Sequence, residues 1–126
     1  MEKGYILVQV SVALESLPLE NARVEIYAHR GEERELISAS LTDPEGKTQR
    51  LEVDAPDIIF SETPDNGTVP YSLFDIFITS EGFYSVAVRD VQVFPQRTSL
   101  QYVNMIPLPE GVNEGENIIV VKPQNL

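Results

Sequence analysis

The residues of this chain that could hold a cation are four acidic side chains near one turn in the sequence. Asp43 and Glu45 flank the turn, and Asp54 and Asp57 follow it. Carboxylate oxygens are ligands that Ca²⁺ prefers, but the spacing matches no known calcium-binding loop. With 20 Asp and Glu in 126 residues, such groups also arise by chance. We therefore interpret the pattern as a structural turn, keep calcium as the alternative, and expect no metal or cofactor site.

Acid–base or nucleophilic catalysis has few candidate groups in this sequence. His29 is the only histidine, so any Ser-His-Asp arrangement would have to use this one imidazole, and no nucleophile-elbow motif accompanies it. The absence of cysteine excludes a thiolate nucleophile, a thiolate zinc site and a disulfide. His29 stands at the end of a strand-like segment, where a histidine is usually a surface residue. We expect no catalytic site and no enzymatic activity.

A binding surface is the remaining candidate, because some aromatic and apolar residues fit no inward-facing strand pattern. Several lie in segment 54–70, which has three prolines and no usable period. Aromatic side chains are favoured anchors in interfaces. The alternative is that this loop caps an open end of the fold and buries Ile58 and Phe60. The predicted binding surface consists of Ile59, Phe60, Tyr71, Phe83 and Tyr84.

The charge balance narrows the class of partner. Lys and Arg total 9 against 20 acidic residues, a net charge of −11, which repels phosphate backbones and anionic lipid. The longest apolar run near the end, residues 118–121, is far too short to span a bilayer. Residues 1–4 carry no basic leader pattern, so we expect any export signal to belong to a larger chain. These observations predict no nucleic-acid partner and no membrane insertion.

Apolar and polar residues alternate with a period of two in several segments, and helical spacing is nowhere sustained. The chain therefore predicts an all-β fold, a seven-stranded antiparallel Greek-key β-sandwich over residues 1–108. Residues 109–126 are expected to form a linker or an added edge strand. The expected strands cover residues 4–14, 22–28, 36–42, 48–53, 71–79, 83–94 and 99–106. The expected core contains Ile6, Val8, Val10, Val12, Val24, Ile26, Leu41, Ile76, Ile78, Val86 and Val88.

Two local features refine this prediction. In the turn 43–47, Asp43 can cap the backbone with its side chain, Pro44 fixes its own φ, and Gly46 supplies a positive φ. We expect this turn to join segments 36–42 and 48–53 as a hairpin. In segment 83–94 the apolar residues change from even to odd positions at Arg89 and Asp90. Such a change of phase is typical of one extra residue in a strand and predicts a β-bulge.

Three segments follow one another in a recognisable order: residues 21–26, the turn sequence LTDPEGKT at 41–48, and FITSEGFY at 77–84. Together they resemble the carboxypeptidase regulatory-like domain, a transthyretin-like or prealbumin-like domain. The resemblance covers residues 4 to about 105. It implies a non-catalytic accessory domain that stabilises, spaces or recognises on behalf of a neighbour.

A narrower resemblance covers residues 69–75, 91–95 and 103–110. These strings resemble modules of Gram-positive spore formers that stand beside peptidoglycan-binding repeats and in spore cortex-lytic enzymes. This implies a cell-envelope or spore setting as part of a larger protein, with a neighbouring domain or a peptidoglycan-associated protein as partner. Two functions follow: an accessory interaction module, or a structural spacer or pro-region that stabilises a neighbouring catalytic domain.

Overall fold

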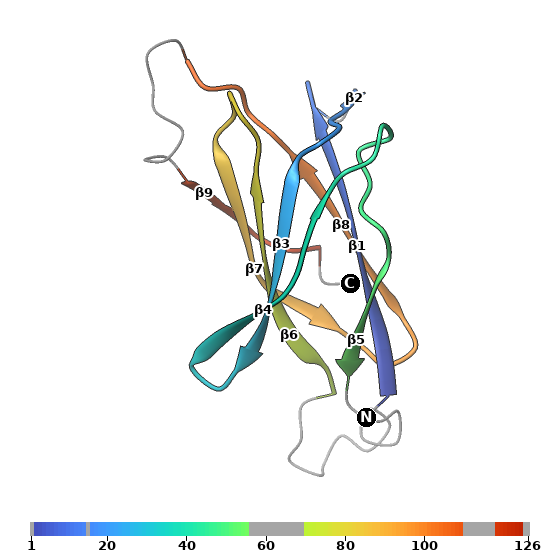
Figure 1. Ribbon diagram of the computed structural model, residues 1–126. Coiled ribbons are helices and arrows are strands. Elements are labelled where there is room, and N and C mark those ends of the chain that lie inside the picture. Colours follow the sequence, from blue (N-terminus) through green and yellow to red (C-terminus); the bar gives the residue numbers. More distant parts are fainter. Residues whose placement is uncertain (1, 15, 56–69, 110–117, 125–126) are drawn as a thin grey trace.

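The computed structural model describes residues 2–14, 16–55, 70–109 and 118–124. These residues form nine strands in two sheets that pack face to face as a sandwich (Figure 1). They include no helix, and hence none long and apolar enough to cross a membrane. The all-β prediction is confirmed for this part of the chain.

The first sheet is built around β1 (Glu2–Val12). Its neighbour on one side is β8 (Thr98–Asn104), which runs parallel to it. On the other side, β5 (Leu51–Ala55) and the short β2 (Leu17–Pro18) pair antiparallel with opposite ends of β1. Three β-branched residues in alternate positions of β1 face the second sheet, which explains why the strand occupies the centre.

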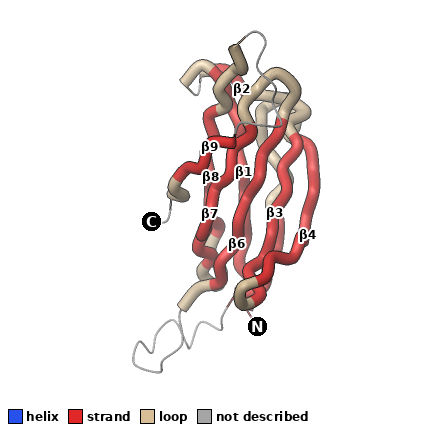
Figure 2. The backbone as a smooth tube through the Cα atoms, turned by 90° about the vertical axis from the view of Figure 1, so that its left-hand side faces the viewer, coloured by secondary structure: helices blue, strands red, loops and turns tan. Residues whose placement is uncertain are grey.

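The second sheet has five strands in the order β4-β3-β6-β7-β9. The first four are connected antiparallel, and β9 pairs parallel with β7 along the edge (Figure 2). The strands are β3 (Arg23–Arg30), β4 (Glu33–Leu41), β6 (Ser72–Thr79), β7 (Ser85–Val93) and β9 (Ile118–Val121).

The apolar core lies between the sheets, and most of the predicted core residues belong to it. Val12 is only partly buried but packs against the core. Leu41 was predicted to be buried, and this is wrong: its side chain is 59% exposed. A bulge at Ile37 changes the phase of β4, so that Ser40 lies opposite the buried Val24 while Leu41 lies opposite the exposed Arg23.

The turn at residues 43–47 forms as predicted, but the hairpin does not. Asp43 Oδ1 accepts hydrogen bonds from the backbone N–H groups of Glu45 and Lys47, both at 2.9 Å, and Gly46 has φ +79°. However, β4 and β5 belong to different sheets, so the turn carries the chain from one sheet to the other. The hairpin prediction was wrong because a turn sequence specifies a local reversal and not the strand with which the chain then pairs.

After this crossing, the turn itself is hydrogen-bonded to β1. The N–H of Val10 donates to the carbonyl of Gly46 at 2.6 Å, and the N–H of Thr48 donates to the carbonyl of Val8 at 2.9 Å. The Thr48 hydroxyl accepts a further bond from the N–H of Val8 at 3.1 Å. The turn therefore occupies the part of the β1 edge that lies between β2 and β5.

The strand count and directions differ from the prediction in detail. The described residues form nine strands rather than the seven predicted, and the β1–β8 and β7–β9 pairs are parallel rather than antiparallel. Beyond β9 the chain crosses to the first sheet, where the Gln124 side chain accepts a hydrogen bond from the N–H of Tyr102 at 3.0 Å. Within residues 109–126, the part described thus contains an edge strand followed by a short crossing segment.

Candidate functional site

Asp75 is a buried carboxylate on the outer face of the five-stranded sheet. Its neighbours in β6, Phe74 and Ile76, point into the core, and side chains alternate along a strand, so Asp75 points the other way. It is nevertheless only 7% exposed. A buried charge requires partners, and neighbouring strands supply them.

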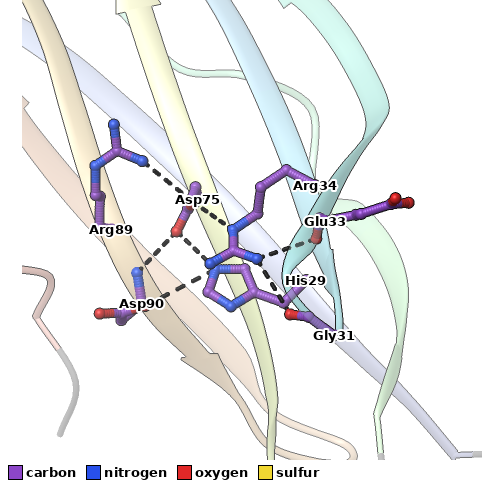
Figure 3. A network of polar contacts seen from close by, with 7 residues as sticks. All are labelled: His29, Gly31, Glu33, Arg34, Asp75, Arg89 and Asp90. Carbon is purple, nitrogen blue, oxygen red and sulfur yellow. Dashed lines mark hydrogen bonds and ion pairs between the residues drawn. The ribbon is translucent and has the colours of Figure 1, made fainter.

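The Asp75 cluster consists of His29, Arg34, Asp75, Arg89 and Asp90 (Figure 3). His29 Nε2 lies 2.8 Å from Asp75 Oδ1, and Arg34 Nε donates to Oδ2 at 3.0 Å. Arg89 makes a longer contact with the same Oδ2, at 3.5 Å. Because a carboxylate only accepts hydrogen bonds, the His29 ring carries its proton on Nε2 in this arrangement. The cluster thereby connects β3, β4, β6 and β7.

The bulge in β7 directs Arg89 and Asp90, on the left in Figure 3, toward Asp75. Phe74 pairs with Val91 and Ile76 with Val88, so Arg89 and Asp90 together stand opposite Asp75. The N–H of Asp90 donates to Asp75 Oδ1 at 3.0 Å, and Asp90 has φ +61°. The bulge predicted from the phase change is confirmed.

The electrostatics of Asp75 favour the ionised form. Burial raises the pKa of its carboxyl, but the hydrogen bond from His29, the N–H of Asp90 and the nearby positive charge outweigh burial and lower the pKa overall. A carboxylate with a lowered pKa is a weaker base than an ordinary one. All its contacts go to donors that hold strands together. The arrangement is therefore suited to an ion-pair cluster rather than to proton abstraction.

His29, Asp75 and Asp90 also each offer one possible metal-ligand atom, and these atoms lie within 4.8 Å of one another. Nε2 of His29 is 3.8 Å from the Asp90 carboxylate. A divalent cation there would have to displace the His29 proton and would stand beside the guanidinium groups of Arg34 and Arg89, which already neutralise Asp75. The charges fit hydrogen bonding better than metal binding.

An open depression of about 810 Å³ adjoins the cluster at the β9 edge of the sheet, and we call it the β9 groove. Arg89 and Asp90 belong to both features. The groove combines an aromatic ring, aliphatic side chains, two cations and one carboxylate. It is lined by Tyr71, Leu73, Arg89, Asp90, Gln92, Val120, Val121, Lys122 and Pro123.

Of the residues predicted as a binding surface, the three that the structure describes do not lie together. Tyr71 is half-buried, lines the β9 groove and contacts Phe94 edge-on, with ring centroids 5.6 Å apart. Phe83 and Tyr84 lie at the opposite end of β6, where Tyr84 N–H donates to the carbonyl of Ile106 and Phe83 packs against the core. Ile59 and Phe60, like Ile58, lie outside the described residues.

The acidic residues considered for calcium serve other contacts in the part of the chain that the structure describes. Asp43 caps its turn, Glu45 forms an ion pair with Lys47 at 3.8 Å, and Asp54 forms one with Lys3. Asp57 lies outside the described residues. The structural interpretation of the turn is supported by these bonds.

Sequence reasoning missed the Asp75 cluster. His29, predicted at the surface, has a side chain only 12% exposed and is bonded to Asp75. The available signal was Asp75 itself, a charge in the middle of an otherwise apolar strand, which is costly unless it is paired. The second signal was the pair Arg89 and Asp90, polar residues at which the apolar alternation of β7 changes phase.

Comparison with known proteins gives a fold but no family. No protein-family model matches the sequence, and no curated protein matches it either. Catechol 1,2-dioxygenase from Acinetobacter sp. ADP1 is similar in structure with a TM-score of 0.57 and 13% identity, over 95% of this chain and 58% of the dioxygenase chain. Catechol 1,2-dioxygenase from Pseudomonas arvilla C-1 is similar with a TM-score of 0.57 and 12% identity, over 94% of this chain and 57% of the dioxygenase chain.

Transthyretin from Sparus aurata is also similar, with a TM-score of 0.51 and 12% identity over 82% of this chain and 90% of that one. This chain thus spans less than two thirds of the dioxygenases but most of the transthyretin. Identities this low show the fold alone. The chain has a transthyretin-like β-sandwich fold.

Proposed function

We propose that this chain is a non-catalytic interaction module whose transthyretin-like sandwich presents the β9 groove to a partner. The observation that carries the proposal is the composition of the groove. Tyr71 and Leu73 offer apolar surface beside charged side chains of the neighbouring strand, on a face that the core does not need. Convergent apolar and polar groups in a surface depression are typical of binding sites.

The Asp75 cluster supports the same proposal through rigidity. It fixes the bulge at Asp90 relative to β3 and β4, so the floor of the groove is held in one geometry. A preorganised surface loses less entropy when it binds. Because the cluster's carboxylate has a lowered pKa and is fully engaged with donors, it supports positioning rather than turnover.

The biological setting we propose is a cell-envelope or spore-cortex protein, in which this chain acts as a carboxypeptidase regulatory-like accessory domain. The support is the resemblance of residues 69–75, 91–95 and 103–110 to modules that accompany peptidoglycan-binding domains. The alternative function is a structural spacer or a pro-region that stabilises a neighbouring catalytic domain. The cross-strand ion pairs of the Asp75 cluster support this alternative, because a spacer needs a stiff domain but no binding surface.

Retention on purified peptidoglycan sacculi from a Gram-positive spore former tests this proposal. We expect the parent chain to be retained and Tyr71→Ser to lose retention at nearly unchanged melting temperature. Leu36→Ser is the matched control, because Leu36 is 48% exposed in β4, at the other edge of the sheet. No retention of the parent would reject the peptidoglycan setting. Loss of stability with unchanged retention would show that Tyr71 is structural.

A further inference from the structure

We infer that the β9 groove binds the free C-terminal carboxylate of an aliphatic peptide, with the carboxylate between Arg89 and Lys122. The inference rests on the proposed function, since it assigns a ligand chemistry to the same groove. Both cations line the groove together with Leu73 and Val120. A carboxylate next to an aliphatic side chain matches this pairing of charge and apolar surface.

Arg89 is the first reason, because it is only loosely held by Asp75. Its contact with Oδ2 is 3.5 Å, whereas that of Arg34 is 3.0 Å. Its side chain is 57% exposed, compared with 38% for Arg34. A guanidinium has five N–H donors, so Arg89 can keep its contact with Asp75 and still offer donors to a second carboxylate.

Lys122 is the second reason. It is exposed, it follows β9 directly, and it forms no ion pair with another described residue. Its neighbour Pro123 is half-buried, and Gln124 is anchored to β8 by hydrogen bonds with Tyr102 and Gln101. The lysine therefore lies on a segment fixed at both ends, by β9 and by Gln124, rather than on a free tail.

The local charge balance selects the ligand class. The cluster and the groove together contain three positive side chains, Arg34, Arg89 and Lys122, and two negative ones, Asp75 and Asp90. Their sum is one surplus positive charge when His29 is neutral. The whole chain carries −11, so it repels polyanions at long range. One carboxylate on an otherwise uncharged apolar body satisfies both conditions, whereas a nucleic acid or a strongly acidic protein segment does not.

The test uses two hexapeptides of the sequence Gly-Ser-Gly-Ala-Leu-Val with acetylated N-termini, one a free acid and one a C-terminal amide. Each is titrated into the ¹⁵N-labelled chain while amide shifts are recorded. We expect the acid to bind at least about 10-fold more tightly than the amide, because charge-assisted hydrogen bonds are lost with the carboxylate. The shifts should centre on Leu73, Arg89 and Val120.

Arg89→Gln and Lys122→Gln should each reduce binding of the acid several-fold and bring it close to that of the amide. Arg50→Gln is the matched control, since Arg50 stacks on Tyr5 in the other sheet and should change nothing. Equal binding of acid and amide, or binding insensitive to both variants, would overturn the carboxylate inference and leave the proposed function intact. So would retention on peptidoglycan without binding of either peptide. Failure of both assays would reject both proposals.

Discussion

The carboxylate of Asp75 accepts a hydrogen bond from the backbone N–H of Asp90 at 3.0 Å across the bulge in β7. One acidic side chain thus satisfies the backbone group that the bulge removes from the strand ladder. The same carboxylate contacts His29 and Arg34. Loss of the Asp75 charge should therefore affect both the bulge and the ion pairs.

Asp75→Asn should lower the free energy of unfolding at pH 7 by about 3 kcal/mol, since it leaves two guanidinium groups without their carboxylate. The native pKa of Asp75 is lowered, so its stabilisation is present above the ordinary aspartate pKa of about 3.9 and is lost as the pH falls through the native pKa. Urea unfolding from pH 7 to pH 2 should show the difference between parent and variant shrinking below about pH 4. A difference independent of pH would contradict this.

Gly46→Ala should destabilise the chain by about 2 kcal/mol or more. A Cβ at this position would lie 2.2 Å from the carbonyl oxygen of Val10, and φ is +79°. Gly31→Ala is the control: it shares a positive φ, +64°, but meets nothing within 4 Å, so it should cost only about 1 kcal/mol. Equal costs in thermal unfolding would mean that the turn does not dock on β1.

Asp90→Val should cost about 2 kcal/mol, because a β-branched side chain is strained at φ +61°. Asp90→Gly removes that strain and should stay within about 1 kcal/mol of the parent. Chemical denaturation of the two variants measures the difference. A valine variant as stable as the glycine variant would show that residue 90 does not hold the left-handed conformation of the bulge.

Val10→Ala should cost about 1–3 kcal/mol, since Val10 is fully buried and its truncation leaves a cavity. Leu41→Ser should change the unfolding free energy by no more than about 0.5 kcal/mol, because Leu41 faces solvent. Melting temperatures of the two variants compare a buried position with one that the register of β4 places in solvent. A large cost at Leu41 would indicate that it is covered by a partner or packs inward.

The sequence by itself determined those features that depend on near neighbours in the chain. Alternation in 4–14 placed Ile6, Val8 and Val10 in the core, because the side-chain period of a strand is two whatever its partners are. The turn at Asp43–Gly46 follows from one side-chain cap and one positive φ. The phase change at Arg89 and Asp90 located the bulge for the same local reason.

Tertiary structure decided which strands meet, and therefore every feature that needs two of them. The bulge at Ile37 turned Leu41 outward, since register depends on the partner strand. The crossing between sheets after residue 41 depends on the edge of β1, where the turn bonds to Val8 and Val10, more than thirty residues earlier in the chain. The Asp75 cluster joins residues 29, 34, 75 and 89, whose proximity comes from the order β4-β3-β6-β7. Asp75 signalled that a partner must exist, but only the packing of the strands determined which residues these partners are.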